Sequence, residues 1–417
     1  MASKYNLNTI AVFLLAAYSA TPAIAQGGVF DITKSTPAIA QGGVFDITKF
    51  GAKPNADATA ALTSAWKEAC ASTTPSKIVV PKGTFILGLI KFDGPCKAPI
   101  ELNVQGTLQS PSDLESFKGA DGWVVFGHLD FFTMSGNGAF DGQGHIGWEK
   151  NDCHKNKKCS LLPYNLRFNF LANSIIKDVT TKDSKNFHVN VLGCSNFTFQ
   201  NFKVSAPAES PNTDGIHIGR SNGVNITDTT IETGDDCISI GDGAKNVYIE
   251  RVKCGPGHGI SIGSLGKYRN EENVTGIFVK NCTLTNTDNG VRIKTWPKSE
   301  PGFASEMHFE DIIMNNVTNP VLIDQEYCPW NQCTLGVGSK VKISNVSFKK
   351  ITGTSSTREV VKLLCSPDFP CQNVEVGNID LKYSGKDGPA IAVCKNLKAT
   401  ITKPFPDGCT ASAALPK

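Results

Sequence analysis

The chain has 417 residues, of which 40% are hydrophobic and 19% are charged, with 39 glycines. This composition excludes a disordered chain, a coiled coil and a protein made of long helices, and the length by itself would suggest two or three domains. The formal charge of +3 comes without a long run of lysine and arginine, so a nucleic-acid-binding protein that relies on a basic face is also excluded.

The first residues follow the pattern of a secretion signal. Lys4 precedes an apolar stretch, residues 10–17, and an A-x-A exit follows it, which predicts a signal peptide over residues 1–25. The stretch is shorter than the roughly 20 apolar residues that span a membrane. The segment TPAIAQGGVFDITK occurs twice, so a second, equivalent cleavage position follows Ala40. We interpret the duplication as a tandem repeat without a function of its own.

A helix is predicted early in the mature chain. The segment Asp57–Cys70 starts with a capping residue and continues with alanine, leucine and tryptophan. These apolar side chains could cover the open end of a repetitive β-structure, which would otherwise expose strand edges and core.

A repeat follows, and it predicts the architecture. Apolar or small residues recur at offsets 0, 2, 5 and 7 in six segments, which begin at Phe197, Val224, Val247, Ile277, Met307 and Val341. Offset 4 holds Asn or Asp in five copies and Arg251 in the sixth, and Asn and Asp tolerate the left-handed conformation of a sharp corner. Each segment is predicted to be strand, corner, strand. The spacing is too short for helices on both faces and suits one turn of a parallel β-helix.

A third strand in each turn has the pattern apolar, variable, apolar. It occurs at Ile216/Ile218, Ile238/Ile240, Ile260/Ile262, Val291/Ile293 and Val321/Ile323. Stacked turns place equivalent residues about 4.8 Å apart, with alternate side chains inside and outside. The predicted fold class is therefore all-β, a parallel β-helix with a short N-terminal capping helix, and residues 41–417 are expected to form one domain.

Polar residues that can carry chemistry precede these third strands. Asp214, Asp236 and His258 each lie two residues before the first inward isoleucine of three consecutive turns, so they are expected to stack. Asp235 lies beside Asp236. Carboxylates crowded in this way repel one another, so at least one should have a raised pKa and hold a proton. A protonated and an ionised carboxyl group together are what glycosidic hydrolysis requires.

Two cations are predicted on the same face. Arg292 and Lys294 occupy the outward positions of the fourth of these strands. Side chains two residues apart on one face of a strand can bind a substrate carboxylate by charge-assisted hydrogen bonds. The predicted partner is therefore an acidic sugar polymer.

These segments carry a family resemblance. The sequence resembles the polygalacturonases, the pectin-hydrolysing glycoside hydrolases, in NTDGIHI, GDDCISIG, GPGHGISIGSLG and RIK, and the similarity runs from about Phe45 to the C-terminus. It is most similar to the pollen-type exopolygalacturonases of plants, including the forms SPNTDGIH and DQEYCPW. The resemblance implies a right-handed parallel β-helix and inverting, exo-acting hydrolysis of α-1,4-linked galacturonate in pollen or in cell-wall remodelling. It implies no cofactor and no metal.

The resemblance also implies roles for individual residues. Asp235 would be the general acid, and Asp214 and Asp236 would hold and deprotonate the water. His258 would tune the proton of the acid and bind substrate. The residues implied to bind or position galacturonate are Arg292, Lys294, Asn212 and Tyr327. If the mechanism is inverting, the acid and base carboxyl groups should stand about 6.5–9.5 Å apart.

The 14 cysteines indicate a secreted protein, because cytosolic thiols are kept reduced. Close spacing in sequence suggests the disulfides Cys153–Cys159, Cys328–Cys333, Cys365–Cys371 and Cys394–Cys409. Two longer bridges, Cys237–Cys254 and Cys70–Cys96, would fix the loop of the acidic pair and the capping helix. Cys194 and Cys282 remain, and Cys282 is expected to be a buried free thiol. Glycosylation sequons occur at Asn196, Asn225, Asn273, Asn281, Asn316 and Asn345.

Several alternatives remain open from the sequence. The enzyme could be an endopolygalacturonase or a rhamnogalacturonan hydrolase, since exo action depends on loops that close one end of the groove. A pectate lyase would need calcium and an arginine base. A catalytically silent wall-binding β-helix would have no need of the complete acidic set. We expect a monomer, secreted to the cell wall, that binds pectic polysaccharide and neither nucleic acid nor membrane.

Overall fold

The computed structural model describes residues 43–409, except 153, 154, 157, 158, 160, 161, 330–332 and 335, and these residues belong to the compact unit Ala40–Lys417. The predicted signal peptide and both cleavage positions lie outside the described residues. None of the helices among the described residues is long and apolar enough to cross a membrane.

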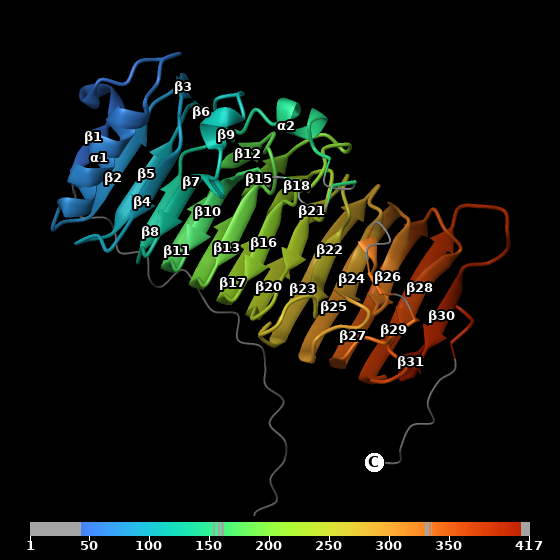
Figure 1. The fold of residues 1–417 in the computed structure, drawn as a ribbon. Coiled ribbons are helices and arrows are strands. Elements are labelled where there is room, and N and C mark those ends of the chain that lie inside the picture. The colour runs from blue at the N-terminus through green and yellow to red at the C-terminus, as the bar shows by residue number, and fades with distance from the viewer. Residues whose placement is uncertain are drawn as a thin grey trace, which may run out of the picture. The chain divides into compact units, whose positions relative to one another are not determined.

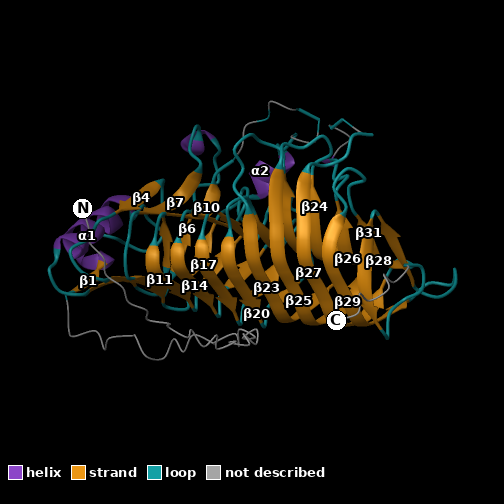
Figure 2. Ribbon diagram, turned by 90° about the horizontal axis from the view of Figure 1, so that it is seen from below, coloured by secondary structure: helices purple, strands orange, loops and turns teal. Residues whose placement is uncertain are grey.

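Parallel strands stack into rows along one axis (Figures 1 and 2). A 20-stranded sheet contains two of the rows. The first row is β1 (Val44–Asp46), β2 (Ser76–Val80), β5 (Ile100–Val104), β8 (Phe132–Ser135), β11 (Ala172–Lys177), β14 (Ser195–Gln200), β17 (Asn222–Thr227), β20 (Lys245–Glu250), β23 (Val274–Thr285), β25 (Gly302–Val317), β27 (Val341–Ser355), β29 (Cys371–Tyr383) and β31 (Leu397–Thr402). The second row is β3 (Thr84–Ile86), β6 (Thr107–Gln109), β9 (Ala139–Asp141), β12 (Thr180–Lys182), β15 (Lys203–Ser205), β18 (Thr230–Glu232) and β21 (Lys253–Cys254), and it continues into the second half of β23.

The remaining strands form an 11-stranded sheet, which carries the candidate site. In spatial order it contains β30 (Ile391–Lys395), β28 (Glu359–Leu364), β26 (Asn319–Asp324), β24 (Asn289–Thr295), β22 (Ile260–Leu265), β19 (Ile238–Ile240), β16 (Ile216–Gly219), β13 (Val189–Leu192), β10 (Tyr164–Asn169), β7 (Gly122–Gly127) and β4 (Ile90–Asp93). Among the described residues, the helical elements are α1 (Thr59–Ala71), α2 (His145–Glu149) and the short 3-10 helices η2 (Ile47–Phe50) and η3 (Glu115–Phe117). The predicted parallel β-helix is confirmed.

The register of this sheet follows the predicted third-strand pattern. Ile216, Ile238, Ile260, Val291 and Val321 pair successively from β16 to β26. All five side chains are buried, so the repeat places identical apolar positions in one continuous core. Removing these side chains from water is the main favourable term for such a stack.

The corners adopt the left-handed conformation that offset 4 predicted. The φ angles of Asn201, Asp228, Arg251, Asn281 and Asp311 lie between 48° and 54°. Arg251 is the exception in residue type, and its guanidinium pairs with Asp228, the corner residue of the preceding turn, at 2.7 Å. This ion pair offsets part of the cost of a left-handed conformation in a residue with a long side chain.

The capping helix lies where it was predicted, but it begins one residue later than a cap at Asp57 implies. Helix α1 begins at Thr59, while Asp57 lies outside it and accepts a hydrogen bond from the Thr59 amide at 2.8 Å. Trp66 packs against the rings of Phe92 and Phe132, with centroids 4.5 and 6.0 Å apart. Figure 1 shows α1 at the N-terminal end of the stack. Its residues Leu62, Ala65 and Trp66 belong to the apolar core, so the helix covers that end.

Five predicted disulfides are present: Cys70–Cys96, Cys237–Cys254, Cys328–Cys333, Cys365–Cys371 and Cys394–Cys409. Cys194 and Cys282 are free and buried, as expected for Cys282. The sixth predicted pair, Cys153–Cys159, includes Cys153, which lies outside the described residues.

Candidate active site

The predicted site residues meet on the outer face of the 11-stranded sheet. Asp214, Asp235 and His258 lie in the loops that lead into β16, β19 and β22. The Gly215 amide donates to the Asp236 carbonyl at 2.9 Å, and the His258 amide donates to the Asp235 carbonyl at 2.7 Å. These bonds fix the three loops in the predicted register.

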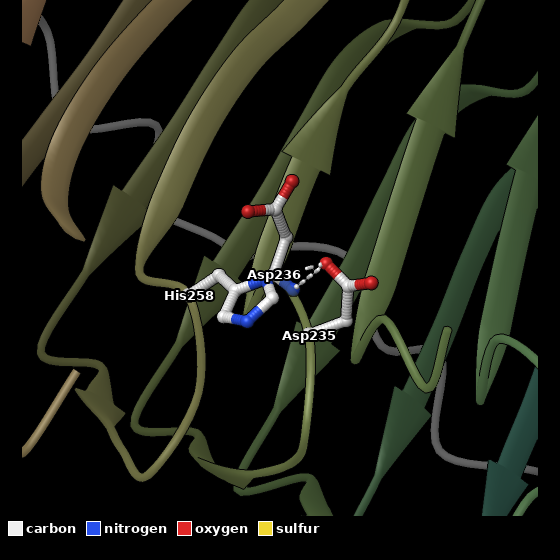
Figure 3. A group of neighbouring side chains, drawn as sticks. All are labelled: Asp235, Asp236 and His258. Carbon is white, nitrogen blue, oxygen red and sulfur yellow. Dashed lines mark hydrogen bonds and ion pairs between the residues drawn. The ribbon is translucent and has the colours of Figure 1, made fainter. Parts of the chain in front are cut away.

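Asp235 and His258 form a hydrogen-bonded pair. Asp235 Oδ1 lies 2.9 Å from His258 Nδ1 and accepts the Asp236 amide at 2.8 Å (Figure 3). His258 Nε2 lies 3.4 Å from Asp288. Burial opposes a positive charge on His258, but the hydrogen bond to Asp235 and the surrounding carboxylates raise its pKa. The sequence predicted a stack of His258 on Asp236. The backbone register agrees with that prediction, but the imidazole bonds to Asp235.

A glycine permits this close approach of the two loops. Gly257 has a φ of 144°, and a Cβ there would lie 2.8 Å from the Asp235 carbonyl oxygen. Both the backbone conformation and the contact disfavour any side chain at this position.

Asp236 is buried in a cluster of positive charge. Its carboxylate pairs with Arg292 Nη2 at 2.8 Å and with Lys294 Nζ at 2.7 Å, and it accepts a hydrogen bond from Ser261 Oγ at 2.9 Å. Burial favours the neutral acid, but the two cations outweigh it and lower the pKa of Asp236 to about 2. Arg292 and Lys294 point outward as predicted. Their pairing with the protein's own carboxylate was not predicted.

Asp214 has the opposite electrostatic environment. Its side chain is buried and accepts a hydrogen bond from Ser239 Oγ at 2.7 Å. Burial and the charges of Asp235 and Asp236 raise the pKa of Asp214 well above its ordinary value. One carboxyl group of the cluster therefore favours its proton and another is firmly ionised, as the crowding of three carboxylates predicted.

The other two candidates lie nearby. The Tyr327 ring lies 5.1 Å from Lys294 Nζ and 5.8 Å from Arg292 Cζ, measured to its centroid, so it covers both cations. Asn212 precedes Asp214 by two residues in the same loop, with a left-handed φ of 56°.

Sequence reasoning missed three polar residues of the site. Ser239, Ser261 and His217 occupy the variable position between the inward isoleucines. Ser239 and Ser261 donate to Asp214 and Asp236, and His217 is hydrogen-bonded to Ser239. The repeat register contained the signal, because these positions point outward directly beside the loops that carry Asp214 and Asp236.

One group of donors in the site has the arrangement of a metal site. Ligand atoms of Asp235, Asp236 and His258 lie within 4.8 Å of one another. Both Asp236 oxygens are paired with cations and His258 Nδ1 is bonded to Asp235, so a metal ion would have to displace these partners. The donor set fits a proton-transfer site better than a cation site.

One carboxylate oxygen of Asp235 and one of Asp236 lie within 4.8 Å of each other. This distance joins single oxygen atoms, whereas the range of about 6.5–9.5 Å for inverting enzymes refers to whole carboxyl groups, so the separation of acid and base stays a prediction.

A parallel β-helix that carries a cluster of carboxyl groups on one outer sheet has the acid and base groups that glycoside hydrolysis requires. The chain matches the family described as glycosyl hydrolases family 28 over residues 70–403. It is 62% identical to an exopolygalacturonase of Oenothera organensis, over 86% of this chain and 99% of the relative, and 59% identical to a polygalacturonase of Nicotiana tabacum, over 94% of each. The chain belongs to glycosyl hydrolase family 28.

Solved structures share the fold. An exopolygalacturonase from Thermotoga maritima superposes with a TM-score of 0.74 at 19% identity, over 88% of this chain and 91% of that one. An endo-xylogalacturonan hydrolase from Aspergillus tubingensis also gives 0.74, at 24% identity, over 89% and 99% of the two chains. At these identities the likeness supports the fold alone.

Proposed function

We propose that this protein is an exopolygalacturonase, which removes galacturonate from the end of α-1,4-linked polygalacturonate. The observation that carries the proposal is that two neighbouring carboxyl groups have different partners. Asp235 is hydrogen-bonded to His258, and Asp236 forms ion pairs with Arg292 and Lys294. Family membership and the similarity to plant exopolygalacturonases support the same substrate.

Asp235 is the general acid in this proposal. Its Oδ1 is occupied by the Asp236 amide and by His258, which leaves Oδ2 to carry a proton to the leaving glycosidic oxygen. The C1–O bond breaks as this proton is transferred, and the electron pair of the bond stays on the leaving oxygen.

Asp236 and Asp214 hold the attacking water. Water adds its oxygen to C1 from the opposite face, and its proton passes to one of these carboxylates. Asp236 stays ionised because of its two cations, so it orients the water. Asp214 has the higher pKa of the two, so its ionised form is the stronger base and takes the proton from the water.

The remaining candidates bind the acidic sugar. Arg292 and Lys294 have donors beyond those used by Asp236, and these donors, with Tyr327, are proposed to bind a galacturonate carboxylate. Asn212 is proposed to position the same sugar unit. The protein is proposed to act as a monomer in the cell wall. The five disulfides among the described residues support secretion.

Product analysis tests the activity. We expect reducing sugar to be released from polygalacturonate, with monomeric galacturonate as the sole early product by anion-exchange chromatography. An early ladder of oligomers would mean endo action, and products that absorb in the ultraviolet would mean a lyase. Proton NMR during the first turnovers should show the β-anomer, because an inverting enzyme converts the α-linkage.

The disulfide beneath the site gives a second prediction. Replacing both Cys237 and Cys254 with alanine opens a loop of 17 residues and should cost about 3 kcal/mol of unfolding free energy. It should also lower kcat, because Cys237 follows the acidic pair directly. Cys394 and Cys409 are 15 residues apart in sequence, and their disulfide lies away from the site. Replacing both with alanine should cost a similar unfolding free energy and leave kcat unchanged. Equal kcat values for the two double variants would contradict a role in positioning the loop.

A further inference from the structure

A chain of hydrogen bonds reaches Asp214 from a residue with no assigned role. Ser239 Oγ donates to Asp214 Oδ2 at 2.7 Å and lies 2.7 Å from His217 Nδ1. A serine hydroxyl has one proton, and Ser239 gives it to Asp214. His217 must therefore donate from Nδ1, which fixes the tautomer of its neutral ring. We call His217, Ser239 and Asp214 the histidine relay.

The fold builds a place for this imidazole. His217 and Ser239 are paired residues of β16 and β19, so their outward side chains are neighbours on the sheet. The Phe187 ring lies 5.5 Å from the His217 ring. A Cβ at Gly241 would lie 3.1 Å from His217 Nε2, so the missing side chain leaves the room that the ring occupies.

An equivalent cluster lies one turn further along. Ser261 donates to Asp236 at 2.9 Å and accepts from Arg292 Nε at 3.0 Å. Each acidic residue thus accepts from the serine of the next turn, but the group behind the serine differs. Arginine is a permanent cation, whereas burial lowers the pKa of His217 to about 4, so it stays neutral in mild acid. Ser261 therefore accepts from a permanent cation, whereas Ser239 accepts from a neutral imidazole.

We propose that His217 is a positioning residue for the reaction: it holds Ser239 as the donor to Asp214 Oδ2 and thereby leaves Asp214 Oδ1 to accept the proton of the attacking water. The inference rests on the proposed function, since it assigns a use to the geometry of Asp214. His217 itself touches no reacting atom.

The surrounding charges set the direction of the expected pH effect. Asp235, Asp236, Lys294 and Tyr164 face Asp214. Asp236, Lys294 and Asp242 face His217. The bond from Ser239 favours ionised Asp214 and so lowers the pKa of this carboxyl group, against burial and the neighbouring carboxylates. Loss of that bond raises the pKa, and a base that must be ionised then works only at higher pH.

Substitution of His217 tests the relay. His217→Phe keeps a ring of similar size but removes the donor, and we expect kcat to fall about tenfold with little change in KM. The acid limb of the kcat profile should move to higher pH, and Ser239→Ala should move it further. His217→Asn places an amide N–H near the former Nδ1 and should restore most of kcat and the wild-type acid limb.

A matched histidine controls for lost stability. His308 Nδ1 lies 2.9 Å from Ser347 Oγ between β25 and β27, on the other sheet. His308→Phe breaks the same type of bond and should leave kcat and the pH profile unchanged. The proposal is wrong if His217→Asn is as impaired as His217→Phe, or if the acid limb of Ser239→Ala stays at its wild-type position.

A titration of the free protein separates this proposal from the proposed function. With aspartate labelled by carbon-13 and the Asp214 signal assigned through Asp214→Asn, Ser239→Ala should raise the pKa of Asp214 without any substrate present. If that shift is seen while the wild type does not hydrolyse polygalacturonate, the proposed function fails and the relay stands. An unchanged titration overturns the relay even in an active enzyme.

Discussion

Asp235→Asn is expected to lower kcat on polygalacturonate by about 10³-fold and to change substrate binding little. Asparagine retains the Oδ1 acceptor for the Asp236 amide, so the loop should keep its conformation. It cannot carry the acidic proton, and general acid catalysis contributes about 10²–10⁴-fold. Reducing-sugar assays give kcat, and equilibrium binding of an oligogalacturonate to the variant gives the affinity.

A surface aspartate provides the control for this substitution. Asp228 pairs with Arg251 at a corner of the other sheet, so Asp228→Asn should leave kcat unchanged. Loss of oligogalacturonate binding by Asp235→Asn with turnover retained would contradict the acid role.

Lys294→Met is expected to reduce the unfolding free energy by about 3–5 kcal/mol near neutral pH. Lys294 and Asp236 are 7% and 1% exposed, and removal of one partner leaves a buried carboxylate with incomplete compensation. Urea denaturation measures the difference. Lys350→Met is the matched control, because Lys350 pairs with Glu310 at 2.8 Å on the exposed surface, where water screens the pair, so its loss should change the unfolding free energy little.

The effect of Lys294→Met should depend on pH. The pKa of Asp236 is about 2 in the folded protein and about 3.9 in an unfolded chain, so ionised Asp236 stabilises the wild type above pH 4. This contribution is lost as the pH falls from about 4 to about 2. The stability difference between wild type and variant should shrink over the same interval. If the difference in unfolding free energy stayed constant from about pH 4 to about pH 2, the ion pair with Asp236 would not be the source of that difference.

Activity should fall in the same variant. Lys294→Met removes a proposed substrate contact and frees Asp236 to take up a proton, so both KM and kcat should change. An unchanged KM would contradict the role of Lys294 in binding the galacturonate carboxylate.

The repeat made most of the fold predictable. Inward residues such as Ile216 and Ile238 recur at fixed offsets, and a stacked strand has only one register that buries all of them. The same register brought Asp214, Asp236 and His258 into consecutive turns. The disulfide Cys237–Cys254 was predictable because it joins two segments that the register already places side by side.

The pairing within the site was not predictable, because register fixes backbones and leaves the direction of loop side chains open. Asp235 and Asp236 are neighbours in sequence, yet one carboxylate bonds to His258 and the other points away from that ring (Figure 3). The second carboxylate pairs with two cations. The register placed Ser239 and Ser261 beside the acidic loops, but it did not show that their hydroxyl groups bond to Asp214 and Asp236, since a serine at an outward strand position is usually only solvated.

Periodicity and spacing were enough to predict the β-helix, its corners, five of its disulfides and the set of acidic and basic residues that share one face. These features depend on periodicity and spacing, which are local properties of the chain. The charges of Asp214 and Asp236 could be assigned only from the folded structure, because the pKa of each depends on burial and on partners from other turns. It buried Asp214 beside Ser239 and His217, where a proton is favoured, and it buried Asp236 beside Arg292 and Lys294, where the anion is favoured.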